Sequence, residues 1–234
     1  MSGILYIISA PSGSGKTTLV NELRQYVPYL EFSVSFTTRP PRGSEQDGRE
    51  YHFITRGEFE NMIERDEFLE YAQVFGNYYG TAKSVLLQAK ERGNDLLLDI
   101  DVQGERQVKQ KMPDAVSIFV LPPSRRELES RLRKRMLSEN VHSEETIGRR
   151  LATAKREIEK YVNYDYILIN DRLEQSVDCL QAIVLGERLR RSGKPPSPEE
   201  KRYLETAEKC LKSKMEDKIK DILDSFDDSS PPED

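Results

Sequence analysis

A glycine-rich segment near the start of the chain has the residue types and spacing of a phosphate-binding loop. Glycines let backbone N–H groups turn inward around phosphate oxygens, a lysine reaches the terminal phosphates, and a hydroxyl can bind Mg²⁺. The match is complete except that alanine replaces the first glycine of the pattern. We therefore predict a nucleoside triphosphate site, with Lys16 catalytic and Thr17 a metal ligand, made by Ala10, Pro11, Ser12, Gly13, Ser14, Gly15, Lys16, Thr17 and Thr18.

The elements flanking this segment favour a phosphate-binding loop over an ordinary Gly-Ser turn. Ile4–Ser9 is a continuous apolar run, which is typical of a strand buried on both faces. Thr17–Val27 carries its apolar residues on one stripe, and Pro28 should stop that helix. A strand, a glycine loop and a helix in this order are the structural context that the motif requires.

Asp99 is the second candidate group of the triphosphate site. It ends the apolar stretch Leu96–Leu98, within a strand expected over Asp95–Ile100. A strand that delivers a carboxylate beside a phosphate loop can hold Mg²⁺ or its water ligands. The alternative is that Asp99 only caps the helix that follows.

Residues further along the chain could hold a phosphorylated acceptor. Arg39 and Arg42 stand three apart on a proline-stiffened stretch, and the arginine fork suits phosphate oxygens. Tyr51 and Tyr79 could donate to the same phosphate, and Glu70 could accept hydrogen bonds from a base. Taken singly, each tyrosine suits packing and Glu70 suits a solvated helix face.

The remaining pattern alternates strands with helices. Residues 31–82 are rich in Thr, Arg, Gly and Tyr, with one helical stretch near Gly57–Glu70, and should form an inserted lobe. The alternation predicts an α/β fold with a parallel, doubly wound sheet that binds ligands beyond the carboxyl ends of its strands. Further strands are expected at 115–121 and 166–169. Helices are expected at 84–92, 103–112 and 173–191. Two more helices should lie between these, one that starts at a Ser124–Glu127 capping box and one that runs from the polar break at 138–142 to about residue 163.

Three stretches, SVSFTTRPPRGSEQDGREYHF, GNYYGT and LLLDIDVQG, closely resemble the guanylate kinases, which are P-loop NTPase-fold nucleoside monophosphate kinases. The resemblance spans residues 3–190 and implies transfer of the γ-phosphoryl group of Mg·ATP to GMP, giving ADP and GDP. It implies a core with a GMP-binding lobe near 35–82 and a helical lid near 125–165.

The same resemblance implies roles for individual residues. Lys16, Thr17 and Asp99 would serve ATP and Mg²⁺, and Asn170 would lie beside the adenine. The GMP site would take its guanine contacts from Ser35, Glu70 and Asp101, and its phosphate contacts from Arg39, Arg42, Tyr51 and Tyr79, with Thr81 lining it.

Arginines on two further helices are candidates for stabilising the charge that develops during phosphoryl transfer. The resemblance assigns this catalytic role to Arg131, Arg135 and Arg150. The alternatives are solvated helix faces or nucleic-acid binding, and no interleaved aromatic residues support the latter. The chain departs from the family's short Gly-Arg-Gly turn at residues 134–136 and continues with a longer connection, 137–142, so we expect a different lid tip.

The end of the chain is expected to be an appendage, residues 192–234, to a domain formed by residues 1–191. Ser192–Pro198 has the composition of a linker. Glu199–Phe226 has apolar residues at helical spacing, which predicts an amphipathic helix that docks on the body or on another subunit of a homo-oligomer. Its mixed polar face disfavours membrane binding, and Asp227–Asp234 has the composition of a disordered end.

Composition sets the limits of the assignment. The net charge is −5, of which the appendage carries −4, so the body is nearly neutral and a general nucleic-acid binder is disfavoured. Two Cys and two His, widely scattered, make no metal-ligand pattern and no disulfide framework. No long apolar run or secretory signal is seen, so we expect a cytoplasmic protein without a membrane partner.

Two other functions are compatible with parts of the pattern. A kinase acting on a phosphorylated sugar would use the same phosphate loop but would not need Ser35 and Glu70 to contact a base. A catalytically silent scaffold that binds phosphorylated peptides would have no use for the loop at all. The intact loop therefore favours an enzyme, and Ser35 and Glu70 favour a nucleotide acceptor.

Overall fold

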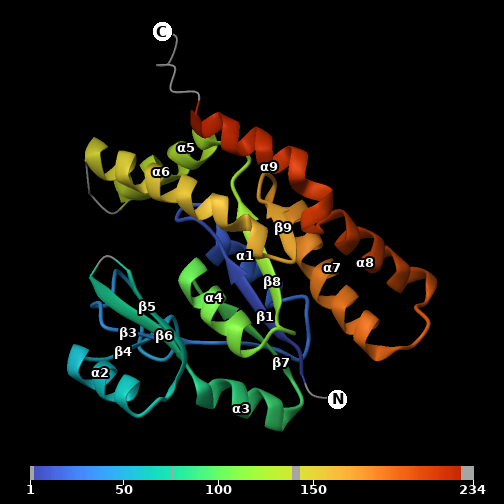
Figure 1. Ribbon diagram of the computed structural model, residues 1–234, viewed down its shortest axis with the longest axis horizontal. Coiled ribbons are helices and arrows are strands. Elements are labelled where there is room, and N and C mark those ends of the chain that lie inside the picture. The colour runs from blue at the N-terminus through green and yellow to red at the C-terminus, as the bar shows by residue number, and fades with distance from the viewer. Residues whose placement is uncertain (1–2, 75, 139–142, 228–234) are drawn as a thin grey trace. The chain divides into compact units, whose positions relative to one another are not determined.

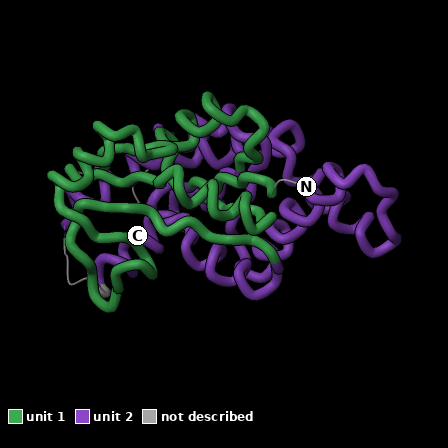
Figure 2. Tube along the Cα trace, turned by 90° about the horizontal axis from the view of Figure 1, so that it is seen from below, with its two compact units in different colours: residues 1–9, 29–117 green, residues 10–28, 118–234 purple. Residues whose placement is uncertain are grey.

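The computed structural model describes residues 3–74, 76–138 and 143–227. The chain divides into two compact units, coloured separately in Figure 2. Unit 1 comprises residues 1–9 and 29–117, and unit 2 comprises residues 10–28 and 118–234.

Unit 1 contains three parallel strands with nearly continuous apolar sequences. β7 (Asp95–Asp99) lies between β1 (Leu5–Ser9) and β2 (Leu30–Phe32) and pairs with both. One face of β1 and β7 is covered by α3 (Lys83–Arg92) and α4 (Val102–Lys111), labelled in Figure 1. The buried residues of this cluster include Leu5, Ile7, Leu96, Leu98, Ala89 and Val108. Burial on this scale explains why these strands show no polar alternation.

A second, four-stranded sheet forms the inserted lobe of unit 1. Its strand order is β4 (Tyr51–Phe53), β3 (Ser35–Thr37), β6 (Asn77–Ala82) and β5 (Phe68–Val74). β3 and β4 are parallel, and the other two pairings are antiparallel. α2 (Arg56–Glu64) begins at a Thr55–Glu58 capping box and buries Phe59. The Phe59 ring stacks on Phe68 and Tyr78, with ring centroids 4.3 and 5.0 Å away.

The expected helix near Gly57–Glu70 is wrong in its second half. α2 ends at Glu64, Asp66 adopts a left-handed backbone with φ of 54°, and β5 begins at Phe68. The strand pairs with β6 along its length, and Phe68 packs on Phe59. Tertiary pairing therefore overrides the local helical pattern, and Glu70 lies on a buried strand rather than on a solvated helix face.

Unit 2 holds a parallel strand pair and most of the helices. β8 (Val116–Leu121), from Ile118 onward, pairs with β9 (Tyr166–Ile169). The helices of this unit are α1 (Lys16–Leu23), α5 (Arg125–Ser138), α6 (Glu144–Ile158), α7 (Leu173–Ser192), α8 (Pro198–Lys209) and α9 (Lys212–Asp227), with a 3₁₀ turn, η1 (Glu159–Asn163), after α6. The parallel pairings in both units confirm the expected α/β class with a parallel sheet.

Several element ends differ from the expected ones. α1 stops at Leu23 instead of Val27, and the helix expected to reach residue 163 changes to 3₁₀ geometry after Ile158. The N–H of Glu127 donates to Ser124 Oγ at 3.2 Å, but the Glu127 carboxylate pairs with Arg131. The region of the expected lid tip at residues 139–142 and the acidic end after residue 227 lie outside the described part of the chain.

The appendage forms two helices instead of the single one expected. Between α8 and α9 the backbone pairs with the edge of β9, where Leu211 bridges Tyr166 and the N–H of Ile167 donates to the Cys210 carbonyl at 2.8 Å. A continuous helix could not offer these backbone groups, because it would use them internally. Within unit 2, α8 contacts α7, and α9 contacts α5 and α6. Docking on the body of the same chain is one of the two arrangements expected for the appendage.

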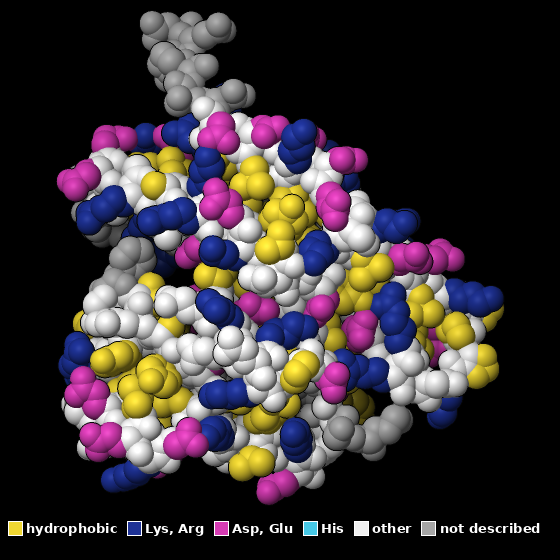
Figure 3. Space-filling view, in the orientation of Figure 1, with side chains coloured by type: hydrophobic (Ala, Val, Ile, Leu, Met, Phe, Trp, Pro, Cys, Tyr) yellow, Lys and Arg dark blue, Asp and Glu magenta, His cyan; other side chains and the backbone are white. Residues whose placement is uncertain are grey.

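The surface carries mixed charge. Figure 3 shows Lys and Arg side chains interspersed with Asp and Glu on the face in view. Within the described residues, no helix is long and apolar enough to cross a membrane. Cys179 and Cys210 are both free thiols.

Candidate functional site

The predicted phosphate loop of unit 2 lies between the end of β1 and the start of α1. Gly13 and Gly15 have φ of 95° and 85°, a region that strongly favours glycine. The N–H of Ser14 donates to the Pro11 carbonyl at 3.1 Å, which closes the loop. Gly15 is the N-cap of α1, and no side chain caps this described helix end. The first-turn N–H groups of α1 are therefore available to an anion.

The two loop glycines also allow close packing of neighbouring elements. A Cβ at Gly13 would lie 3.0 Å from Leu132 Cδ2 and 3.1 Å from Leu128 Cδ1, both on α5. A Cβ at Gly15 would lie 2.4 Å from Asn170 Nδ2, which is a clash. Glycine at these positions therefore serves both the loop conformation and the approach of α5 and Asn170.

Arg131 and Asn170 meet on the carbonyl of Ser14. Asn170 Nδ2 donates to this oxygen at 2.7 Å, and Arg131 Nη1 donates to it at 3.4 Å. Arg131 Nη2 also donates to the Asn170 carbonyl at 2.9 Å, while its Nε pairs with Glu127 at 2.8 Å. The structure thus brings two predicted site residues together with the loop and fixes the direction of its carbonyl groups.

The other predicted residues of unit 2 differ in exposure. Lys16 begins α1 and is half-buried, whereas Thr17 and Thr18 are exposed. Arg150, on α6, is half-buried, and its Nη1 is buried without a hydrogen-bond partner. A buried, unpaired guanidinium donor is costly, which is the expected state of a group prepared for an anionic ligand.

Arg135 is exposed on α5. Its neighbour Arg133 is occupied by ion pairs with Glu129 and Glu144, at 2.8 and 2.5 Å. Ser14 Oγ is a further buried group without a partner in this loop.

In unit 1, Glu70 is the most deeply buried of the predicted acidic residues, at 3% exposure. It lies on β5 opposite Thr81 of β6, which is fully buried. Its carboxylate rests against the start of α4: a Cβ at Gly104 would lie 2.5 Å from Glu70 Oε2. Gly104 is not among the predicted site residues, and a glycine inside a helix is no specific signal of close approach, since helical Gly57 has nothing within 4 Å of an added Cβ.

Burial raises the pKa of Glu70 from 4.5 to about 7, and the negative charge of Asp101 adds to this increase. Contact with Thr81 and the positive charge of Lys111 oppose it. The Thr81 hydroxyl lacks the geometry of a full hydrogen bond, so we treat it as a partial partner. Near neutral pH, a group that donates a hydrogen bond to Glu70 should therefore shift the carboxyl group towards its ionised form.

Asp101 is the N-cap of α4. Its side chain accepts from the N–H groups of Gln103 and Gly104, at 3.0 and 2.9 Å. The aspartate that caps this helix is thus Asp101, whereas Asp99 ends β7 opposite Ile8 of β1. Asp99 therefore stands at the carboxyl end of the strand next to the one that leads into the phosphate loop, which is the predicted place of a metal-binding carboxylate.

Three predicted residues lie on adjoining strands of the lobe. Ser35 is buried on β3 and pairs with Tyr51 on β4. Tyr79 on β6 pairs with Thr37, and its ring contacts that of Tyr51 edge to face, with centroids 5.9 Å apart. The two tyrosines are half-buried, so their hydroxyl groups can reach a ligand while their rings pack.

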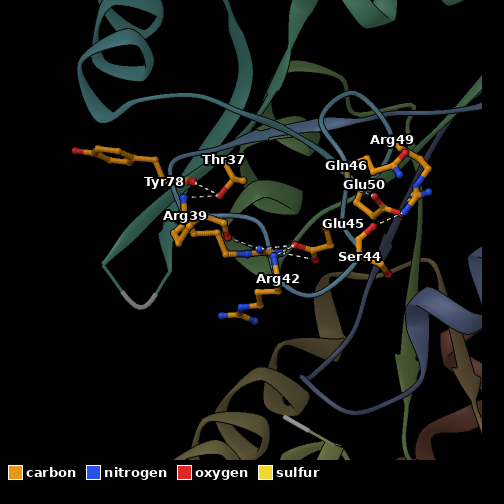
Figure 4. A network of polar contacts seen from close by, with 10 residues as sticks. Thr37, Arg39, Arg42, Ser44, Glu45, Gln46, Arg49, Glu50 and Tyr78 are labelled. Carbon is orange, nitrogen blue, oxygen red and sulfur yellow. Dashed lines mark hydrogen bonds and ion pairs between the residues drawn. The ribbon is translucent and has the colours of Figure 1, made fainter. Parts of the chain in front are cut away.

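Arg39 is held by Glu45, a residue that the sequence did not identify (Figure 4). Its two terminal nitrogens donate to the two carboxylate oxygens at 2.7 and 2.8 Å, and its guanidinium carbon lies 4.9 Å from the centre of the Tyr51 ring. Arg39 is 6% exposed, whereas Arg42 is exposed and donates only its backbone N–H to Glu45, at 2.8 Å.

The ion pair changes the titration of both partners. The hydrogen bond to Glu45 raises the pKa of Arg39 against the effect of burial, and the same bond lowers the pKa of Glu45. This bidentate contact fixes the orientation of the guanidinium. The Arg39 backbone is fixed as well, because Thr37 Oγ1 accepts from its N–H at 3.3 Å and donates to the Tyr78 carbonyl at 3.0 Å.

Comparisons with known proteins identify the family of the chain. Residues 2–187 match the guanylate kinase family. A guanylate kinase of Koribacter versatilis (strain Ellin345) is 58% identical over 233 residues, covering 100% of both chains. A guanylate kinase of Desulfitobacterium hafniense (strain Y51) is 48% identical over 193 residues, covering 82% of this chain and 94% of the relative.

A solved structure of a guanylate kinase has a similar fold. The crystal structure of guanylate kinase from Anaplasma phagocytophilum is similar, with a TM-score of 0.67 and 33% sequence identity over 80% of this chain and 87% of the other. This likeness confirms the expected P-loop NTPase fold. With a family match that spans most of its length and a full-length relative at high identity, the chain belongs to the guanylate kinase family.

Proposed function

We propose that this guanylate kinase transfers the γ-phosphoryl group of ATP to GMP by direct in-line attack, with ATP bound by unit 2 and GMP by the lobe of unit 1. The observation that carries the GMP assignment is the desolvated Glu70 carboxylate, which faces Thr81 and the open backbone of Gly104. Such a group is suited to accept hydrogen bonds from the N1–H and N2 amino group of guanine.

The ATP half-site uses donors that the fold has already positioned. Backbone N–H groups of the loop and of the first turn of α1 would hold the phosphates, and Lys16 would contact their terminal oxygens. Arg131 and Asn170 stabilise the loop through the Ser14 carbonyl, and Asn170 would lie beside the adenine. Arg150, whose Nη1 has no partner, would meet the charge that develops on the transferred group, and Arg135 would join it when the lid closes.

Mg²⁺ fits the donors that the chain supplies. The Thr17 hydroxyl and the Asp99 carboxylate are hard oxygen ligands of the type this ion prefers. The described residues contain no group of three or more His, Cys, Asp or Glu side chains that could hold a metal. Two protein ligands at most, with phosphates and water completing the shell, are the usual arrangement for Mg²⁺ bound with ATP. When bound, the ion would neutralise phosphate charge.

The acceptor phosphate would be held by arginine and tyrosine side chains. Arg39, already aligned by Glu45, and the exposed Arg42 would contact its oxygens, and Tyr51 and Tyr79 would donate their hydroxyl protons. The base would be recognised by Glu70 and Asp101 as acceptors and by Ser35 as a donor to O6, with Thr81 lining the site.

The chemistry then needs no covalent enzyme intermediate. A phosphate oxygen of GMP attacks the γ-phosphorus of ATP, and the bond to the β-phosphate oxygen breaks, leaving ADP. The protein aligns two anions that repel each other, neutralises their charge and excludes the water that would otherwise hydrolyse ATP. In this scheme the lid, made of helices α5 and α6, is the part that moves. Every proposed catalytic residue belongs to the domain formed by residues 1–191.

The rival functions fit the structure less well. A sugar-phosphate kinase would have no need to bury Glu70 beside Thr81, and a silent scaffold would have no need of Arg131 and Asn170 on a phosphate loop. We place the reaction in the cytoplasm, with ATP, GMP and Mg²⁺ as ligands and no requirement for a nucleic acid or a membrane.

Acceptor choice tests the function directly. ADP release with GMP, AMP, UMP and CMP should show GMP preferred over AMP by about 10³-fold or more in kcat/KM, because adenine presents a lone pair where Glu70 needs a donor. Glu70→Gln should weaken GMP use by about 1–3 kcal/mol with little change in the KM for ATP. Glu67→Gln, at an exposed acid near the same strand, is the control. Equal use of GMP and AMP would remove guanine specificity from the function.

The contact between Gly104 and Glu70 gives a second test. Gly104→Ala should raise the KM for GMP about 10-fold or more, because its methyl group would displace the carboxylate, while the KM for ATP stays within about two-fold. Gly57→Ala is a matched control, since Gly57 is also helical, lies in the same unit and has nothing within 4 Å of an added Cβ. Equal effects of the two substitutions on GMP would contradict the assignment of Gly104.

The phosphate loop gives a third test. Lys16→Ala should lower kcat at least ~100-fold, the scale typical of losing one preorganised charge contact to a transition state. Asn21→Ala, at an exposed position of the same helix, should leave kcat within about two-fold. The circular dichroism spectrum of Lys16→Ala should match that of the wild type. Normal turnover in Lys16→Ala would show that the loop is not the ATP site.

A further inference from the structure

The second helix of the appendage lies against the helices of the lid. α9 begins well beyond residues 2–187, which match the family, and within unit 2 it contacts α5 and α6 (Figure 1). The full-length Koribacter versatilis relative aligns over this region, whereas the Desulfitobacterium hafniense relative covers 82% of the chain. The contacts of α9 are therefore a property of this chain that the matched family region does not supply.

The last turn of α9 makes three different contacts with the lid. Ser225 Oγ accepts from the N–H of Arg125 at 3.0 Å, at the first residue of α5. Asp227 forms an ion pair with Lys155 of α6. Phe226 packs against the apolar cluster that joins the two lid helices, which consists of Leu128, Leu132, Met136, Ile147, Leu151 and Ala154.

These contacts have distinct physical consequences. The N–H of Arg125 belongs to the first turn of α5, where helix donors lack internal acceptors, so Ser225 acts as a cap supplied from outside. Phe226 covers an apolar surface that would otherwise face water. The ion pair between Lys155 and Asp227 is largely exposed and should contribute little energy by itself.

The start of α9 is fixed at the other end. Leu211 bridges Tyr166 of β9, and the N–H of Lys212 donates to the Asp165 carbonyl at 3.1 Å. Lys212 Nζ donates to the Val162 carbonyl at 2.6 Å. A helix rises about 1.5 Å per residue, so α9 reaches from this anchored edge to the lid as a rigid element.

The same cluster contacts the phosphate loop on its other side. Leu128 and Leu132, which help to form the surface under Phe226, are the side chains that approach Gly13 most closely. Arg131, between them on α5, donates to the carbonyls of Ser14 and Asn170. A continuous series of contacts therefore runs from α9 through α5 to the loop.

We propose that the last turn of α9, with Phe226 as its main contact, is a positioning element that holds α5 on the phosphate loop and so presents Arg131 for ATP. This inference rests on the proposed assignment of the loop as the ATP site. Phe226 touches no substrate in this scheme. It acts through the lid cluster, and loosening it lowers the share of molecules in which α5 is correctly placed.

Steady-state kinetics of the full chain can test this role. Phe226→Ala should lower kcat/KM for ATP by about 3- to 30-fold while the KM for GMP stays within about two-fold. Phe226→Leu, which keeps an apolar side chain on the cluster, should restore most of the loss. Asp224→Ala, at an exposed position two residues away, is the control and should match the wild type.

Hydrogen exchange without nucleotide separates this inference from the proposed function. Phe226→Ala should increase amide exchange over residues 125–138 and leave residues 5–9 protected as in the wild type. Met215→Ala removes a buried side chain about 16 Å away along α9, and it controls for general loss of stability. It should leave exchange in residues 125–138 nearer the wild-type level than Phe226→Ala does.

The outcomes are distinct. Unchanged exchange in α5, or equal effects of Phe226→Ala and Asp224→Ala on ATP use, would overturn the positioning role. A rise in kcat in Phe226→Ala would also overturn it, because it would show that α9 restrains the lid. If instead the wild type released no ADP with GMP while α5 still loosened in Phe226→Ala, the function would be wrong and the contact would stand.

Discussion

The proposed GMP site depends on keeping the Glu70 carboxylate out of water without a full hydrogen-bond partner. Burial holds the pKa of Glu70 near 7, and the nearby charge of Asp101 adds to the cost of ionising it. The surrounding structure maintains this state: Thr81 lies opposite on β6, and Gly104 leaves room for the carboxylate at the start of α4. A ligand with two hydrogen-bond donors stabilises the ionised carboxylate, whereas a ligand with a lone pair can pair only with the protonated acid. In the proposed site, base selectivity would follow from that difference.

The proposed ATP site also contains polar groups that lack full partners, but these are hydrogen-bond donors instead of a carboxylate. The loop presents N–H groups at an uncapped helix start, and Arg150 has a buried nitrogen without a partner. In both units glycine allows a polar side chain to touch the backbone: Asn170 at Gly15, and Glu70 at Gly104. Arg39 differs from these groups, because Glu45 forms an ion pair with its guanidinium. An acceptor phosphate would then meet an arginine whose side-chain entropy has already been lost.

The sequence predicted best the features that depend on short segments. The phosphate loop and the strands before it and at Asp95–Asp99 follow from glycine spacing and uninterrupted apolar runs, which act locally. Glu70 was placed on a helix because its local pattern is helical, whereas its strand is defined by pairing with distant β6. Glu45 and Gly104 could not be assigned from spacing, because their roles arise from contacts with Arg39 and Glu70. The break between α8 and α9 depends likewise on the edge of β9.

The protons exchanged when GMP binds test the central claim, that guanine binds to a carboxylate held near its ionisation point. Calorimetric titration of GMP at pH 7, in buffers that differ in ionisation enthalpy, counts them. With a pKa of about 7, Glu70 is about half protonated when free, and hydrogen bonds from guanine should lower that pKa and release about 0.5 proton. The GMP phosphate releases protons as well, so the comparison is with Glu70→Gln, which keeps that contribution. The account predicts about 0.5 proton more released by the wild type than by Glu70→Gln. Equal release by the two proteins, or a smaller release by the wild type, would contradict it.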